Sequence, residues 1–276
     1  MVNSTVYKKI LVTAAREGGA VLHKYFRTAF TVTLKNGIHD IVTLADHEGQ
    51  NSIVSSIIKS VKSTPLEGKI GFIGEEGLFS PGEYTFIIDP LDGTTNYAAS
   101  VDRYCVSIGL MHDKKIIAGV VYDVMRKTFY FSQKGESAYE NSKKLAIPTG
   151  VELSRSVLLS GFPHVSAERL LLLDVFSKSY DYVQTIRVLG STVLDICDVA
   201  AGRCNLVMRA GKLWDLAAAS IILEQAGGVI LDWQGKRFDF DPKDPEKRYK
   251  FIAGEDQLVR EFLHKVHSGK NPDLLK

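Results

Sequence analysis

One twelve-residue segment, 86–97, constrains the fold of this 276-residue chain more than any other. An apolar run at 86–88 leads directly into Asp-Pro-Leu-Asp-Gly-Thr-Thr. Proline fixes φ and glycine permits a sharp turn, so we expect a buried strand that bends and passes into a helix. Asp89 and Asp92 flank the bend and can point at one spot. Asp-Gly is also an ordinary turn signature, but an ordinary turn does not need an acid on either side of a proline.

Further acids follow other apolar runs. Glu75 comes after the run at 70–73, and Asp215 precedes a small-residue helix expected over 216–226. Asp46 comes directly after another apolar stretch. Taken singly, each has an ordinary interpretation as a loop acid or a helix N-cap. Together they predict a cleft lined by carboxylates.

Such a cleft has a defined chemistry. Several carboxylates in one place repel each other and hold protons unless divalent cations compensate them. Oxygen ligands without His or Cys select Mg²⁺ or Mn²⁺ rather than zinc. Two such ions can bridge a phosphate and lower the pKa of a bound water. The backbone N–H groups of Gly93 and Thr94, at the start of a helix, can receive an anion. The pattern predicts metal-assisted hydrolysis of a phosphate ester.

Three motifs carry a family resemblance. Gly-Glu-Glu at 74–76, the segment from Asp89 to Tyr97, and Trp-Asp-Leu-Ala-Ala-Ala at 214–219 resemble the signatures of the inositol monophosphatase family. Their order and spacing also fit, and the resemblance runs from about residue 8 to residue 255. It implies an α/β (α+β) fold, a five-layered α/β/α/β/α sandwich of the sugar-phosphatase type. It also implies Mg²⁺ dependence, lithium sensitivity and a homodimer.

The resemblance assigns metal ligands. Glu75, Asp89 and the carbonyl of Leu91 resemble the ligands of a first ion. Asp89, Asp92 and Asp215 resemble those of a second. Glu75 can hold a third through water, so two to three Mg²⁺ ions are expected, with Mn²⁺ as a substitute.

Catalytic roles follow from the same resemblance. Thr94 is expected to orient the attacking water, with Asp46 accepting from its hydroxyl and Glu75 completing the catalytic set. Gly93, Thr94 and Thr95 are the expected phosphate-binding residues.

The substrate side is less specific. The residues that the resemblance places there are Lys35, Asp92, Gly190, Ser191, Thr192 and Arg209. Family members that prefer inositol phosphates typically carry a Glu seven residues before the motif Asp215, where this chain has Met208. The cationic neighbour Arg209 would favour a second phosphate or carboxylate on the substrate.

The leading hypothesis is therefore a Mg²⁺-dependent phosphomonoesterase of a small phosphorylated alcohol or sugar, most similar to an inositol-1-phosphatase. Fructose-1,6-bisphosphatase, 3′(2′),5′-bisphosphate nucleotidase and histidinol-phosphate phosphatase activities occur on the same scaffold and stay open. The Thr-Asn-Tyr ending of the central motif is unlike the usual nucleotidase form. A non-catalytic ligand-binding or regulatory member is the alternative of another class. It is expected to have lost a metal ligand, and none of the positions is replaced.

Composition excludes several partners. The chain has 34 Lys and Arg against 32 Asp and Glu, a net charge of +2, which argues against a dedicated nucleic-acid or membrane-surface binder. Its three cysteines form no Cys-x-x-Cys pair. There is no leader pattern and no apolar run near the ~18 residues of a membrane span. We expect a cytoplasmic protein that acts on a small metabolite.

Periodicity predicts the organisation of the chain. We expect two halves, 1–148 and 149–276, that form one compact unit, with an antiparallel meander in the first and Asp215 supplied by the second. Helices are expected at 6–25, 46–61, 216–226 and 255–266, and strands at 69–73, 84–88, 106–111, 116–121, 128–131, 156–159, 183–188 and 229–231.

Overall fold

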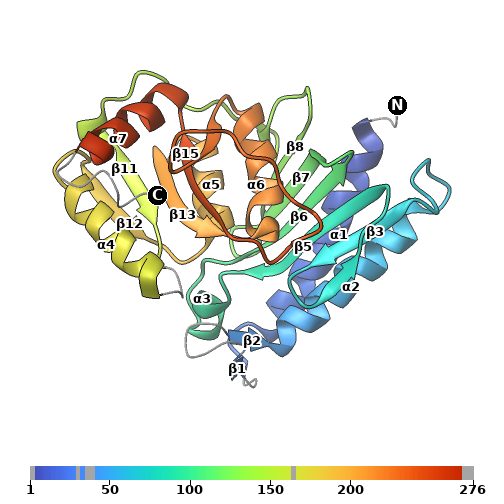
Figure 1. The fold of residues 1–276 in the computed structure, drawn as a ribbon. Helices are drawn as coiled ribbons and strands as arrows, with labels where there is room; N and C mark the ends of the chain where they lie inside the picture. The colour runs from blue at the N-terminus through green and yellow to red at the C-terminus, as the bar shows by residue number, and fades with distance from the viewer. Residues whose placement is uncertain (1–3, 29–31, 35–40, 163–165, 269–276) are drawn as a thin grey trace.

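The structure is a computed structural model that describes residues 4–28, 32–34, 41–162 and 166–268. Helices and sheets alternate in five layers (Figure 1), which confirms the predicted α/β/α/β/α sandwich. Helices α1 and α2 form one outer layer, α5 and α6 the central layer, and α4 and α7 the other outer layer. The bounds are α1 (Ser4–Tyr25), α2 (Leu44–Val61), α3 (Thr94–Ala98), α4 (Ser166–Ser179), α5 (Thr192–Ala200), α6 (Leu213–Gln225), α7 (Asp256–Ser268) and the 3-10 helix η1 (Leu153–Arg155).

The first sheet has eight strands in the order β10-β9-β8-β7-β6-β5-β3-β4. Its pairs are antiparallel except β3 with β5, so the predicted meander is confirmed. The strands are β3 (Ile70–Gly74), β4 (Leu78–Ser80), β5 (Tyr84–Asp92), β6 (Cys105–His112), β7 (Lys115–Asp123), β8 (Thr128–Gln133), β9 (Tyr139–Glu140) and β10 (Lys143–Lys144). A separate pair is formed by β1 (Val32–Leu34) and β2 (Ile41–Thr43).

The second sheet has five strands in the order β12-β11-β13-β15-β14. Strands β12, β11 and β13 run parallel, and β15 pairs antiparallel with both β13 and β14. The strands are β11 (Val157–Ser160), β12 (Thr185–Val188), β13 (Leu206–Gly211), β14 (Val229–Asp232) and β15 (Tyr249–Gly254). In open sheets, ligands bind outside the carboxyl ends of parallel strands, so the segments after β11 and β12 are candidates for a site.

Small residues set the distance between α6 and the first sheet. A Cβ atom on Gly109 would lie 2.7 Å from the Cβ of Ala217, and one on Gly119 would lie 2.7 Å from the carbonyl oxygen of Ala218. The glycines of β6 and β7 therefore let the alanine-rich face of α6 lie directly on the sheet. This close packing brings Asp215, in the first turn of α6, to the end of β5.

The structure corrects several expected elements. Strands β13 and β15 were not predicted, because both are largely buried and lack a polar alternation that marks a strand. Helix α6 begins at Leu213 and α2 at Leu44, each earlier than expected. In both helices the motif acid, Asp215 or Asp46, is the third residue and its carboxylate accepts the backbone N–H of the N-cap residue.

The two sheets use separate parts of the chain, 70–144 and 157–254. Helices α5 and α6 pack between them, and their core includes Tyr130 from the first sheet and Phe251 from the second. We propose on this basis that 1–148 and 149–276 are two halves of one compact unit rather than independent domains.

Candidate metal centre and active site

Three carboxylates meet where β5 ends against the central helices. Asp89 and Asp92 belong to β5 and Asp215 to α6, and each offers a ligand atom within 4.8 Å of the others. Asp89 is 1% and Asp92 8% exposed. These are the three residues that the sequence assigns to the second ion.

A break in the strand register aims the first two acids. Strand β5 shifts against β6 between Asp89 and Asp92, and such irregularities re-aim side chains next to active sites. The backbone N–H of Leu91 donates to Asp89 Oδ1 at 3.0 Å. Gly93 then adopts φ +96°, and a Cβ there would lie 2.9 Å from the carbonyl oxygen of Arg103. The bend predicted from the sequence is confirmed, and this glycine makes it possible.

The amino end of α5 holds Asp92. Ser191, the N-cap of that helix, donates its hydroxyl to Asp92 Oδ2. The backbone N–H groups of Thr192 and Val193 donate to the two carboxylate oxygens, each at 3.1 Å. A carboxylate at a helix amino end is favoured by the partial positive charge there. The donors of Ser191 and Thr192, expected to face the substrate, are thus directed at a metal-site acid.

Asp215 is held from its own helix. The backbone N–H of Lys212 donates to Asp215 Oδ2 at 2.7 Å. A Cβ on Gly211 would lie 2.9 Å from that same oxygen, so the carboxylate packs directly over the end of β13. Neither contact neutralises the carboxylate charge.

Burial and mutual repulsion dominate the electrostatics. Burial raises the pKa of Asp89 well above its ordinary value, and the negative charge of Glu75 raises it further. Burial also raises the pKa of Asp92, and it raises the pKa of Asp215 to about 6, with repulsion from Asp92 as the next cause. Without a cation the cluster therefore tends to take up protons. A divalent ion removes this penalty, and the all-oxygen donor set suits Mg²⁺ or Mn²⁺.

Glu75 lies beside this cluster rather than within it. It follows β3, and its backbone N–H donates to the carbonyl of Ile88 at 3.1 Å. Its charge acts on Asp89, but its carboxylate is not among the three that share the 4.8 Å group. The neighbouring Glu76 is fixed through its backbone by Gln50, with contacts of 3.1 and 3.2 Å.

Thr94 and Asp46 meet as the sequence predicts. The Thr94 hydroxyl donates to the Leu91 carbonyl at 3.0 Å and reaches Asp46 Oδ1 at 3.4 Å. The other oxygen of Asp46 accepts from the backbone and the hydroxyl of Thr43, at 2.7 and 2.6 Å. The N-cap of α2 is Thr43, so the interpretation of Asp46 as an N-cap is wrong. Asp46 instead completes the capping box from the third helical position and also contacts Thr94.

The remaining predicted residues divide into three groups. Gly93, Thr94 and Thr95 lie at the start of α3, next to the cluster. Gly190 has φ +85°, and a Cβ there would lie 2.7 Å from the side chain of Asn96. Lys35 lies outside the described residues.

Position 208, where the inositol-type pattern has a Glu, carries an apolar side chain that faces a core. Met208 is fully buried in the core between the second sheet and the outer helices α4 and α7. Arg209 lies on the opposite face of β13, where its guanidinium pairs with Asp195 at 2.7 Å. Its charge lowers the pKa of Asp92 and of Asp215.

Sequence reasoning missed Asp195 and its second partner, Arg103, which pairs with the same carboxylate at 2.7 Å. Asp195 is fully buried within the otherwise apolar first turns of α5. A charged residue in an apolar helix requires a partner, and that signal was available in the sequence.

The fold and site define a class: two-sheet sandwiches with a buried carboxylate cluster suited to divalent metal. The sequence profile of the inositol monophosphatase family matches residues 3–268, and the chain belongs to that family. The family is metal-dependent and its activity is that of a phosphatase. Among the described residues, no helix combines the length and apolarity needed to cross a membrane.

Individual relatives carry two kinds of name. Human inositol monophosphatase 1 is 31% identical over 258 residues, which is 92% of this chain and 91% of that protein. The Nus factor SuhB of Pasteurella multocida is 31% identical over 271 residues, 93% of this chain and 94% of that protein. The extragenic suppressor protein SuhB of Bartonella henselae superposes with a TM-score of 0.85 at 28% identity, over 95% of this chain and 99% of that one.

Proposed function

We propose that this protein is a Mg²⁺-dependent phosphomonoesterase that hydrolyses a small phosphorylated alcohol or sugar in the manner of an inositol-1-phosphatase. The observation that carries the proposal is the convergence of Asp89, Asp92 and Asp215 within 4.8 Å, in a chain of this family. Burying such a cluster without a cation is energetically costly, and a divalent cation bound there can activate a phosphate ester for hydrolysis.

The residues present fit the expected ions. Asp89, Asp92 and Asp215 would hold one ion. Glu75, Asp89 and the carbonyl oxygen of Leu91 would hold another, and Glu75 can hold a third through water. When bound, such ions polarise the phosphate, lower the pKa of a water and neutralise developing charge on the departing oxygen.

The protein's own groups position the reactants. The Thr94 hydroxyl is held between two acceptors, the Asp46 carboxylate and the Leu91 carbonyl oxygen. Its own oxygen can then accept a hydrogen bond from the attacking water. The backbone N–H groups of Gly93, Thr94 and Thr95 would bind the phosphate oxygens at the start of α3.

We propose that the loop after β12 borders the alcohol part of the substrate. Asn96 donates to the carbonyls of Leu189 and Arg103, each at 2.9 Å, and so ties this loop to α3. Gly190 packs on the Asn96 side chain. The proposed contacts to the alcohol come from Lys35, Asp92, Gly190, Ser191, Thr192 and Arg209.

The test is phosphate release from a panel of esters with Mg²⁺, with Mn²⁺ and with neither, each with and without lithium. The panel contains inositol 1-phosphate, fructose 1,6-bisphosphate, adenosine 3′,5′-bisphosphate, histidinol phosphate and glycerol 2-phosphate. We expect release from at least one ester that requires the divalent ion. Absence of release from every ester, with both ions, contradicts the proposal.

The second candidate is a non-catalytic ligand-binding or regulatory member, and it is kept because the relative from Pasteurella multocida is named Nus factor SuhB and not by a phosphatase activity. A non-catalytic member of this kind should bind a ligand without turning it over. Calorimetry that detects ester binding in the presence of Mg²⁺, together with no phosphate release, would favour it. Lithium inhibition, a homodimer and a cytoplasmic location stay predictions.

A further inference from the structure

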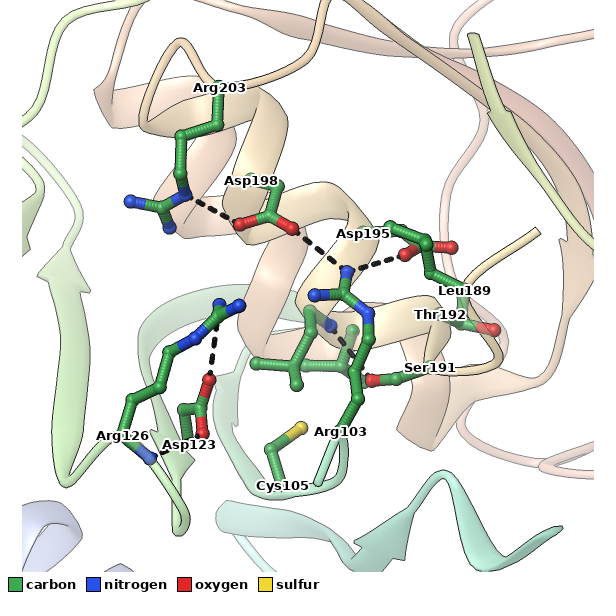
Figure 2. A network of polar contacts seen from close by, with 12 residues as sticks. Arg103, Cys105, Asp123, Arg126, Leu189, Ser191, Thr192, Asp195, Asp198 and Arg203 are labelled. Atoms are coloured by element: carbon green, nitrogen blue, oxygen red, sulfur yellow. Dashed lines mark hydrogen bonds and ion pairs between the residues drawn. The ribbon is translucent and has the colours of Figure 1, made fainter. Parts of the chain in front are cut away.

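A chain of alternating charges runs from the first sheet along α5 to β13. Figure 2 shows its middle part, from Arg203 through Asp198 and Arg103 to Asp195. Successive charged atoms lie 2.6 to 2.9 Å apart. Every internal member has an opposite charge on both sides. In order, the chain consists of Glu140, Arg203, Asp198, Arg103, Asp195 and Arg209.

Arg209 is the end of this chain that carries a positive charge. Asp195 uses Oδ1 for Arg103 and Oδ2 for Nη1 of Arg209, and it is fully buried. Within the part of the protein that the structure describes, this is the one ion pair of Arg209, whose side chain is 15% exposed. The guanidinium therefore keeps N–H donors beyond those that Asp195 receives.

The backbone reserves the space for this guanidinium. A Cβ atom on Gly161, the residue after β11, would overlap the guanidinium of Arg209. Strands β11 and β13 are parallel neighbours, with Ser160 opposite Met208. The absence of a side chain at Gly161 thus leaves room for the guanidinium at the carboxyl end of β11, and the ion pair with Asp195 holds it there.

The face of β13 that carries Arg209 also contacts the cluster of Asp89, Asp92 and Asp215. Side chains alternate along a strand, so Arg209 and Gly211 share a face, about 7 Å apart. Gly211 is the residue on which the Asp215 carboxylate packs. The other wall of the region is the amino end of α5, where Ser191 holds Asp92 and Asp195 follows one turn later.

We propose that Arg209 determines specificity for the alcohol part of the substrate, and that it favours phosphate esters whose alcohol carries a second anionic group, a phosphate or a carboxylate. Asp195 is the positioning residue that holds it. This inference rests on the proposed phosphatase function and narrows its substrate class.

A panel graded by charge tests the proposal. Fructose 1,6-bisphosphate has an anionic alcohol part, inositol 1-phosphate a neutral one and histidinol phosphate a cationic one. In the wild type we expect kcat/KM to fall in that order. In Arg209→Met we expect kcat/KM for the bisphosphate to fall about 10- to 100-fold, mainly through KM, with much smaller changes for the other two esters. Arg209→Lys should restore part of the preference because it keeps the cation.

Two further variants separate specificity from folding. Arg203→Met shortens the charge chain at its distant end and should leave the order of the three esters unchanged. Asp195→Asn should reproduce the change of preference, and adding Arg209→Met to it should change the preference no further. Unfolding temperatures with Mg²⁺ show which variants are folded at the assay temperature.

The outcomes distinguish this inference from the proposed function. If the wild type and Arg209→Met order the three esters identically, the inference is wrong while the phosphatase function stands. If the wild type hydrolyses none of the three, calorimetry with fructose 1,6-bisphosphate decides about Arg209, and the phosphatase function fails only if the other two esters of the full panel also release no phosphate. Equal affinities of the wild type and Arg209→Met for fructose 1,6-bisphosphate overturn the inference. A 10-fold or greater loss of affinity in the variant, which corresponds to about 1.4 kcal/mol of binding free energy, supports it.

Discussion

Two charged regions lie within one turn of each other along α5, and they are built on opposite principles. The cluster of Asp89, Asp92 and Asp215 gathers like charges, and none of the ion pairs of the described residues involves it. The chain that ends at Arg209 and Asp195 alternates signs and is neutral as a whole, with three arginines and three acids. A buried charge that is already paired positions its neighbours, whereas uncompensated carboxylates are ready to receive a cation.

Helix α5 couples the two regions. Its N-cap, Ser191, supports the cluster through Asp92, and the Ser191 carbonyl accepts the backbone N–H of Asp195 at 3.1 Å. The amino end of α5 therefore fixes Asp92, one of the three clustered acids, and also Asp195, which pairs with Arg209. Removing an acid should have opposite consequences for stability in the two regions, and the predictions below exploit this difference.

The largest expected effect is on catalysis. Asp89→Asn removes an acid shared by both proposed ions, and it should lower Mg²⁺-dependent phosphate release by at least about 1,000-fold. Because it also removes repulsion within the cluster, the variant without Mg²⁺ should unfold at the same temperature as the wild type or above it. Asp239→Asn, which alters an exposed acid paired with Lys115, is the matched control for turnover. Wild-type turnover in Asp89→Asn would contradict the assignment.

In the alternating chain the loss of an acid should destabilise the fold. Asp195→Asn leaves Arg103 and Arg209 without their shared carboxylate, and breaking such a buried pair costs about 3–5 kcal/mol. The free energy of unfolding from urea titration measures this directly. Asp256→Asn, which removes an exposed pair with Arg260, should cost less than about 1 kcal/mol. Equal losses in the two variants would show that Asp195 is not structurally important.

The pH dependence of stability should carry the signature of the like-charged cluster. The folded-state pKa of Asp215 is raised to about 6 from 3.8, so the folded protein binds this proton more tightly than the unfolded chain does. The resulting contribution to the free energy of unfolding is fully present below about pH 4 and is lost as the pH rises through 6. Asp215 is partly exposed, and after allowance for solvent screening we expect this loss to be about 1–2 kcal/mol.

The measurement compares unfolding free energies of the wild type and Asp215→Asn between pH 4 and 7 in the presence of a chelator. With the chelator, the unfolding free energy of Asp215→Asn should exceed that of the wild type by an amount that grows with pH. With saturating Mg²⁺, the wild type should instead be the more stable of the two proteins. Parallel pH profiles for the two proteins would exclude a raised pKa at Asp215.

The smallest expected effect concerns the link between the regions. Ser191→Ala removes the hydroxyl that supports Asp92 and should weaken Mg²⁺ binding about 10-fold, as is usual for groups that orient metal ligands. Ser160→Ala is the matched control, because that buried hydroxyl donates to the carbonyl of Met208 within the second sheet. If both variants bind Mg²⁺ equally well, α5 does not support the metal centre.

Local signals account for what the sequence predicted. The bend after Ile88 follows from the residues of one motif, whereas the pairing of Thr94 with Asp46 and the ligand role of Asp215 were expected from the family resemblance. The pairing of Arg103 with Asp195 joins residues 92 positions apart, and no sequence pattern specifies that contact. The burial of Met208 depends on β13 lying between β11 and β15, and β15 was not expected because its mostly buried residues do not alternate.

The central claim is that Asp89, Asp92 and Asp215 together bind a divalent cation. It is tested most directly by titrating Mn²⁺ into the protein and counting bound ions by electron paramagnetic resonance, for the wild type, Asp89→Asn and Asp239→Asn. We predict that the wild type and Asp239→Asn bind at least one Mn²⁺ that Mg²⁺ displaces, and that Asp89→Asn loses this binding. Identical binding curves for the wild type and Asp89→Asn would contradict the claim.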